Sequence, residues 1–307
     1  MNRAENFHEE GNAAIMKSRD FVKPFRVTDG TNFRLGDYDP CETQGLKSKE
    51  HAQERLERGI ARLAKLQEKL YAQDCWALLL ILQAMDAAGK DSTIKHVMSG
   101  VNPQGCEVHS CKAPSAEELQ HDFLWRTSRS LPERGKIGIF NRSYYEEVLV
   151  VRVHRELLER EKIPPALVSD DIWRKRFEDI NAFERYLARN GILVLKFFLH
   201  ISKKEQKTRF LERLKDPDKN WKFSMSDALE RKHWGKYMEA YEDMIRNTST
   251  KHAPWYVVPA DHKWFARLAV AEATIEALES LNLAFPKMDA AKRKELKNAR
   301  SALQREG

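Results

Sequence analysis

The chain has 307 residues, of which 42% are hydrophobic and 32% charged, and its formal net charge is +7. This length suits one sizeable α/β core with a small insertion. The longest apolar run, at residues 76–82, is far shorter than the roughly 20 residues of a membrane helix. An apolar signal-peptide core and a disulfide framework are also missing from the sequence. We therefore expect a cytoplasmic protein without a membrane partner, whose basic surface attracts polyanions.

The first third of the chain predicts an arm, a helix and a strand. Residues 1–45 show no clear periodicity and predict an extended arm. From residue 47 to residue 71, leucine and isoleucine recur at three- and four-residue steps, which indicates an amphipathic helix. The apolar run at 76–83 is typical of a strand that is buried on both faces of a parallel sheet.

Strands and helices alternate along the rest of the chain. Further strands are predicted at 106–109, 136–141, 192–199 and 255–259, and helices at 143–161, 172–190, 203–215, 226–247 and 262–281. This order predicts an α/β fold of three αβα layers around a five-stranded parallel sheet, with ligands at the carboxyl ends of the strands. We expect one domain at 46–285 with a helical lid at 203–225, followed by a basic tail at 286–307.

The first strand leads into the turn Ala84-Met-Asp-Ala-Ala-Gly-Lys90. A phosphate-binding loop (P-loop) needs a buried strand, a turn whose N–H groups surround a phosphate, a lysine and a helix N-terminus. All four are present in this order. The strict pattern fails twice, because Ala84 replaces the first glycine and Asp91 stands where a hydroxyl usually binds Mg²⁺.

A generic strand-to-helix turn, capped by Asp91 or Ser92, is the structural alternative. Asp86 favours phosphate binding, because a carboxylate beside a phosphate is stable chiefly when a divalent cation lies between them. Metal binding is therefore assigned to Asp86 and Asp91. The predicted phosphate-binding residues of the turn are Ala87, Ala88, Gly89, Lys90, Asp91 and Ser92.

Polar groups also follow two later strands. Asn141 and Arg142 end the third strand, where P-loop enzymes place a group near the metal and an arginine can neutralise the transferred phosphoryl group. An N-capped helix, with Ser143 as N-cap and Glu146 at N3, is compatible with this role. Residues 203–222 are rich in basic side chains and predict either a lid or a solvated face.

Five stretches together resemble the polyphosphate kinase 2 family, whose members move phosphoryl groups between inorganic polyphosphate and nucleotides. They are residues 86–91, 123–126, 138–154, 216–223 and 253–259. The resemblance implies that Asp86, Lys90 and Asp91 are the Walker A residues and that Arg142 is the Walker B arginine. It also implies a lid arginine, for which Arg209 is the first candidate; Lys207 and Arg213 are the near alternatives and further phosphate-binding candidates.

At two positions the chain departs from the common family pattern, and there it resembles the class III subgroup, which accepts nucleoside mono- and diphosphates. Asn141 replaces the usual Walker B aspartate, and Glu146 stands where many members have asparagine. The implied function is a reversible polyphosphate:AMP/ADP phosphotransferase that uses Mg²⁺, with Mn²⁺ as a substitute. The implied catalytic residues are Asp86, Lys90, Asn141, Arg142, Glu146 and Arg209.

The implied partners are polyphosphate, AMP, ADP, ATP and also guanine nucleotides, and the implied assembly is a homo-oligomer. Two other functions stay open. The first is an ATP-dependent nucleoside or nucleotide kinase on the same fold. The second is a non-catalytic nucleic-acid-binding protein, which we disfavour because no recognised nucleic-acid motif is present and hence expect no nucleic-acid partner.

Overall fold

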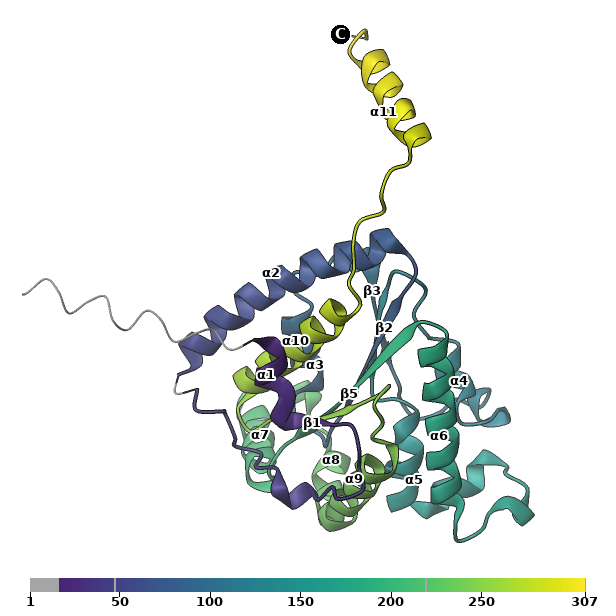
Figure 1. Ribbon diagram of the computed structural model, residues 1–307. Coiled ribbons are helices and arrows are strands. Elements are labelled where there is room, and N and C mark those ends of the chain that lie inside the picture. Colours follow the sequence, from purple (N-terminus) through teal and green to yellow (C-terminus); the bar gives the residue numbers. More distant parts are fainter. Residues whose placement is uncertain (1–16, 47, 219, 307) are drawn as a thin grey trace, which may run out of the picture.

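A computed structural model describes residues 17–46, 48–218 and 220–306 (Figure 1). Several predicted features therefore lie partly outside the described residues. They are residues 1–16 of the arm, Lys47 at the start of the long helix, Lys219 of the lid and Gly307 of the tail.

A six-stranded sheet with the order β1-β6-β5-β2-β4-β3 forms the centre of the fold. The strands are β1 Arg26–Val27, β2 Ala77–Gln83, β3 Cys106–Ser110, β4 Ile137–Asn141, β5 Ile192–His200 and β6 Trp255–Pro259. The five predicted strands are confirmed, and they pair in parallel. The predicted strand number is one too low, since β1 pairs antiparallel with β6 at one edge. Two residues are too few to show the alternation that identifies a strand.

Helices cover both faces of the sheet (Figure 1). One face carries α1 Ser18–Val22, α2 Lys49–Gln73, α3 Lys90–Val97 and α10 Lys263–Ser280, and the other carries α5 Val150–Val153, α6 Ile172–Arg189 and α9 Trp234–Thr248. The short α4 covers Trp125–Ser128. The 3₁₀ helices are η1 Lys23–Phe25, η2 Leu35–Asp37, η3 Pro103–Gly105, η4 Glu118–Gln120, η5 Tyr144–Val148, η6 Arg155–Glu161, η7 Pro165–Leu167, η8 Asn220–Lys222 and η9 Arg231–His233. The three-layer arrangement is as predicted.

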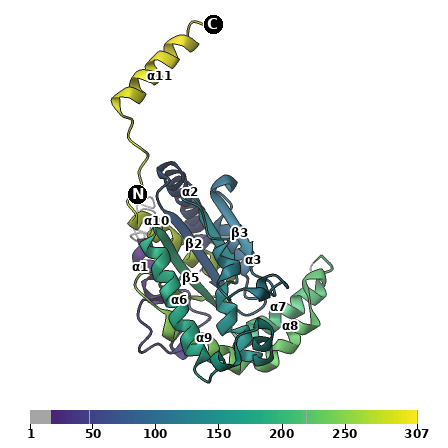
Figure 2. The same cartoon turned by 90° about the vertical axis from the view of Figure 1, so that its right-hand side faces the viewer.

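Three helices lie outside these layers. Figure 2 shows α7 Lys203–Lys215 and α8 Met225–Glu230 projecting beside the sheet, where the sequence predicts a lid. The tail helix α11 Ala290–Leu303 stands away from the body and has no buried residue. Within the described residues, no helix has the length and apolar character that crossing a membrane requires.

Two helices that the sequence predicts as continuous are interrupted. The segment 143–161 divides into η5, α5 and η6, because the backbone leaves helical geometry at Leu149 and His154. Its central run of valines is β-branched and favours helix weakly. The segment 226–247 divides at η9, next to Glu230, whose carboxylate is bound by His154 and by the Tyr237 hydroxyl.

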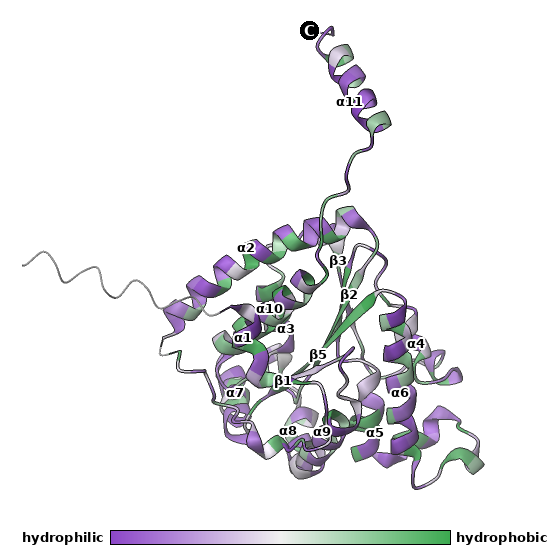
Figure 3. Ribbon diagram, in the orientation of Figure 1, coloured by the Kyte–Doolittle hydropathy of each residue, from purple (hydrophilic) through white to green (hydrophobic). Residues whose placement is uncertain are grey.

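The core follows the hydrophobic pattern of the sequence (Figure 3). Every residue of β2 is buried, as expected for a strand covered on both faces. On α2, Leu56, Leu63 and Leu70 are buried at seven-residue steps, and this face packs against α10. The sheet is therefore a rigid base for the loops that follow its strands.

A buried ion pair joins the sheet to the residues that follow β4. Lys196 Nζ, in β5, lies 2.6 Å from Glu184 Oε2 of α6, and both side chains are fully buried. The hydroxyls of Tyr144 and Tyr145 donate to the other oxygen of Glu184 at 2.9 and 2.7 Å. Burial raises the pKa of both tyrosines and lowers the pKa of Lys196. The pair thereby fixes the polypeptide just before Glu146.

Lys196→Met tests the importance of this pair for stability. The change leaves a buried carboxylate without its cation, and we expect the free energy of unfolding to fall by about 3–5 kcal/mol. Urea denaturation measures the loss, and the double change Lys196→Met with Glu184→Leu should recover part of it. A loss below about 1 kcal/mol in the single variant would contradict the assignment.

Candidate active site at the carboxyl edge of the sheet

The turn between β2 and α3 has two residues in left-handed backbone geometry. Gly89 has φ +110°, which favours glycine, and Ala87 has φ +63°, which is strained for a residue with a side chain. Gly89 occupies the N-cap of α3 and provides no capping side chain. The first N–H groups of α3 consequently depend on another acceptor, and an anion is a suitable one.

A buried arginine of α7 holds this turn. The guanidinium of Arg209 donates to four backbone carbonyls at 2.6–3.1 Å, those of Ala87, Ala88, Ala260 and Asp261. Its Nε donates to Glu205 at 2.8 Å, and the neighbouring Gln206 donates to the carbonyl of Asp86 at 2.9 Å. We predicted Arg209 as an arginine that neutralises moving phosphate charge. In this structure its donors bind backbone carbonyls, and Arg209 also lines the cavity in front of the turn.

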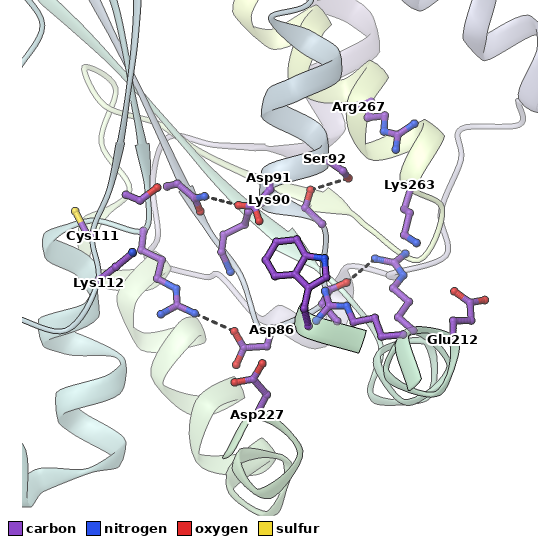
Figure 4. A pocket seen from close by; sticks show the side chains of 18 residues that line it. Asp86, Lys90, Asp91, Ser92, Cys111, Lys112, Glu212, Asp227, Lys263 and Arg267 are labelled. Carbon is purple, nitrogen blue, oxygen red and sulfur yellow. Dashed lines mark hydrogen bonds and ion pairs between the residues drawn. The ribbon is translucent and has the colours of Figure 1, made fainter. Parts of the chain in front are cut away.

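A cavity of about 690 Å³ opens in front of the turn (Figure 4). Of the predicted phosphate-binding residues, Ala87, Gly89, Lys90, Asp91, Ser92 and Arg213 line it. Ala88 is buried behind the turn, and Lys207 is exposed on α7 outside this lining. The predicted residues from the turn and from the end of β4 therefore meet at one place.

Sequence reasoning missed several residues of the cavity. Lys112 lies just after β3, while Lys263 and Arg267 lie in the first turns of α10, after β6. Their positions could have been predicted, because these three residues follow the carboxyl ends of parallel strands, where such sheets bind ligands. Trp221 and Asp227 also line the cavity, from the lid side. Trp221 belongs to the stretch 216–223 that carries the family resemblance, whereas no pattern marks Asp227 in the sequence.

The side chain of Lys90 folds over the turn toward its first residue. Its Nζ donates to the Ala84 carbonyl at 2.8 Å, so the ammonium group is positioned over the loop. Burial, followed by the charge of Arg142, lowers the pKa of Lys90. A phosphate at the loop would counter both effects, because it is a stronger acceptor than a carbonyl and carries negative charge.

Two polar pairs connect the turn with the end of β4. Arg142 Nη2 lies 2.9 Å from Asp86 Oδ1, and Asn141 Nδ2 donates to Asp91 at 2.5 Å. Arg142 itself has φ +64°, another strained conformation at the site. Asp86 thus links the phosphate loop to a cationic side chain at the end of β4.

A second cavity, of about 190 Å³, adjoins the first. Asp86 and Arg142 line both cavities. Glu146 lines only the smaller one, where it accepts a hydrogen bond from Gln83 at 2.7 Å, and Tyr237 and Tyr241 form part of the opposite wall. A group bound in either cavity therefore lies next to the same carboxylate and the same guanidinium.

The residues present fit a Mg²⁺ ion that is shared with phosphate. In Figure 4 the carboxylate of Asp227 faces that of Asp86. Burial raises the pKa of Asp227, and the like charge of Asp86 raises it further, a repulsion that a cation between the two carboxylates would relieve. Among the described residues, no group of three or more His, Cys, Asp or Glu side chains is suited to hold a metal alone. Mg²⁺ commonly binds to one or two carboxylates and completes its coordination with water and substrate phosphates.

A family model for polyphosphate kinase 2 matches residues 46–286. The chain belongs to the polyphosphate kinase 2 family. An ADP-polyphosphate phosphotransferase of Rhodopseudomonas palustris is 52% identical over 283 residues, which cover 92% of this chain and 98% of the relative. An AMP/ADP-polyphosphate phosphotransferase of Meiothermus ruber is 46% identical over 274 residues, which cover 89% and 98%.

A solved structure supports the same conclusion. The crystal structure of polyphosphate kinase 2 from Arthrobacter aurescens superposes with a TM-score of 0.84 at 41% identity, over 94% of this chain and 100% of that one. The resemblance inferred from five short stretches is thus confirmed. This polyphosphate kinase 2 family member has a P-loop kinase-like α/β fold, in agreement with the α/β layers and the phosphate-binding turn predicted from the sequence.

Arg209→Ala and Arg213→Ala should separate a structural from a purely ligand-binding arginine. Arg209→Ala deprives four carbonyls of their donor. In the absence of substrate, we expect the free energy of unfolding to fall by about 3 kcal/mol. Arg213 lines the cavity one turn later, and its replacement should change stability by less than about 1 kcal/mol. Urea denaturation of both variants provides the comparison. Equal stabilities would contradict a structural role for Arg209.

Proposed function

We propose that the protein is a polyphosphate:AMP/ADP phosphotransferase, which moves the terminal phosphoryl group of inorganic polyphosphate reversibly to nucleoside mono- and diphosphates. The observation that carries this proposal is the position of Asp86 and Arg142 between two adjoining cavities. The larger cavity is rich in basic side chains and suits a polyphosphate chain. The smaller one suits the phosphate end of the acceptor. The names of the two relatives agree with this pairing of substrates.

Phosphoryl transfer depends mainly on positioning and on neutralising negative charge. We assign the transferred phosphate to Lys90 and to the first N–H groups of α3. Arg142 stabilises the charge on the phosphoryl group as it passes from one cavity to the other. Glu146 orients the acceptor. Bound Mg²⁺, held by Asp86 and the phosphates, supplies further charge neutralisation.

Other predicted site residues support the loop and the metal or contact the polyphosphate chain. Asn141 positions Asp91, and we infer that Asp91 contributes to the metal's surroundings rather than to a complete ligand set. Arg209 holds the loop in its binding shape. Arg213 is the better candidate for contact with the polyphosphate chain, together with Lys263 and Arg267, because these side chains line the larger cavity.

The remaining expectations, drawn from the sequence pattern or from the family resemblance, belong to this proposal. They are a lid at residues 203–225, a cytoplasmic location, a homo-oligomeric assembly, use of Mn²⁺ in place of Mg²⁺, and acceptance of guanine nucleotides. The lid also has structural support, since Trp221 lines the larger cavity although 77% of its surface is exposed. Closure of this segment would exclude water from the phosphates.

An ATP-free assay tests the proposal. Purified protein with polyphosphate, Mg²⁺ and AMP should form ADP and then ATP, separated by ion-exchange chromatography. Lys90→Ala should abolish transfer, because the phosphate loses its lysine, whereas Lys65→Ala on the exposed side of α2 should not. Activity with ATP as donor but not with polyphosphate would favour the alternative, an ATP-dependent nucleotide kinase.

Glu146→Asn tests the role of the smaller cavity. We expect kcat/KM for AMP to fall about tenfold more than kcat/KM for ADP. A tenfold difference is about 1.4 kcal/mol, roughly the contribution of one hydrogen bond to a charged group. Glu146→Gln keeps the size of the side chain and shows whether the charge is needed. Steady-state kinetics with each acceptor gives the answer, and equal losses for AMP and ADP would exclude a role in acceptor choice.

A further inference from the structure

A buried ion network joins four elements around Glu147 of η5. Arg126 of α4 pairs with Glu147, at 3.0 Å between Nη2 and Oε1. Arg176 of α6 donates to the backbone carbonyl of Glu147 at 2.8 Å and also pairs with Glu161 of η6. These four residues line neither cavity of the proposed active site, so contact with substrate does not explain them.

The burial of these charges is costly, because each one depends on its partners for the interactions that water would otherwise provide. The side chains of Arg126, Glu147 and Arg176 are nearly fully buried. Burial raises the pKa of Glu147 and the charge of Glu161 raises it further, whereas both arginines lower it. The arginines therefore stabilise the charged carboxylate, and the other contacts of Arg126 indicate what the network positions.

Arg126 also binds the segment that follows β3. Its Nη1 donates to the backbone carbonyl of Lys112 at 2.7 Å. Residues 112–114 belong to no helix or strand. Among the described hydrogen bonds, the one from Arg126 is the only one that involves these three residues. The guanidinium therefore fixes the backbone of Lys112 relative to Glu147.

Both residues that Arg126 binds are connected with a substrate cavity. Lys112 lines the larger cavity, and its exposed ammonium group forms no ion pair with the residues that the structure describes. Figure 4 shows Lys112 on the opposite side of this cavity from Lys263 and Arg267. Glu147 directly follows Glu146, which lines the smaller cavity. One guanidinium thus holds the backbone beside a cation of one cavity and beside a carboxylate of the other.

A bound polyphosphate chain gives Lys112 a use. Every phosphate of the chain carries negative charge, so cations along its whole path stabilise it. Lys263 and Arg267 are available on the α10 side of the larger cavity, and Lys112 is available on the β3 side. A lysine ammonium lies at the end of a flexible stem, so its backbone must be fixed if it is to meet a phosphate at a defined place.

We propose that Arg126 is a positioning residue for polyphosphate binding, which holds the backbone of Lys112 so that the Lys112 ammonium contacts the polyphosphate chain. This inference rests on the proposed function, because it requires polyphosphate in the larger cavity. Arginine suits the task, since its planar guanidinium binds the Glu147 carboxylate and the Lys112 carbonyl at the same time. Lysine at position 126 would keep the ion pair and lose the second contact.

Arg126→Lys tests this role without leaving the Glu147 carboxylate unpaired. Calorimetric titration of tripolyphosphate with Mg²⁺ should show an affinity about fivefold lower than that of the wild type, because Lys112 is no longer held at the phosphate. Lys112→Ala should lower the affinity at least as much. The double variant should bind no more weakly than Lys112→Ala, because Arg126 acts through Lys112.

Two further variants accompany this measurement. The matched control Arg129→Lys changes an exposed arginine at the end of the same helix and should leave the affinity for tripolyphosphate unchanged. Arg126→Met/Glu147→Met replaces the buried pair by apolar side chains of similar size, which a protein interior tolerates. It should show the same fivefold loss, and it takes the place of Arg126→Lys if that variant does not fold.

Steady-state kinetics separates positioning from a loss of folded protein. In Arg126→Lys, KM for polyphosphate should rise about fivefold, while kcat and KM for AMP stay close to the wild-type values. Partial unfolding would instead lower kcat, because less active enzyme is present, and would leave KM for polyphosphate unchanged. That second pattern would overturn the proposal.

The binding data can overturn it in two further ways. Equal affinities of the wild type and Lys112→Ala would show that Lys112 does not contact the polyphosphate chain. Losses that multiply in the double variant would show that Arg126 acts independently of Lys112. If tripolyphosphate still depends on Lys90 in either case, the proposed function stands and only this inference fails. A wild type that binds no tripolyphosphate would contradict both.

Discussion

The enclosed guanidinium of Arg209 is the contact on which the phosphate loop depends. Four carbonyls from the loop and from the end of β6 converge on it, so three separate parts of the chain share one cation. Carbonyl groups that point toward Arg209 orient the peptide units of the loop, including the strained one at Ala87. The cost of that strain is offset by hydrogen bonds to a charged group, which are stronger than neutral ones. A loop without the usual first glycine thereby keeps a defined shape.

A second constraint is the concentration of charge around Asp86. Arg142 pairs with it, Asp227 faces it, and Lys90 lies on the same loop. The charge of Asp86 adds to the burial that raises the pKa of Asp227, and the charge of Arg142 adds to the burial that lowers the pKa of Lys90. Phosphate and a divalent cation together would relieve both repulsions, which is why we propose that substrate and metal bind as one unit. The buried Lys196–Glu184 pair holds the residues that follow β4 in place, through the hydroxyls of Tyr144 and Tyr145.

The sequence was sufficient for the parts of the molecule that follow strong local patterns. Apolar runs located the five parallel strands, and the order of strand, turn, lysine and helix located the phosphate loop. Contacts between distant segments were not accessible in this way. Arg209 has the appearance of a lid arginine in the sequence, and only the packing of α7 against the loop shows where its donors point.

The central claim is that the loop ending at Lys90 holds the polyphosphate chain. Calorimetric binding of tripolyphosphate with Mg²⁺ to nucleotide-free protein measures this directly, since it requires neither an acceptor nor turnover. The account predicts that the wild type binds tripolyphosphate, that Lys65→Ala binds it equally well, and that Lys90→Ala loses most of the affinity. Unchanged affinity in Lys90→Ala would contradict the account and would place the polyphosphate chain elsewhere on the basic surface.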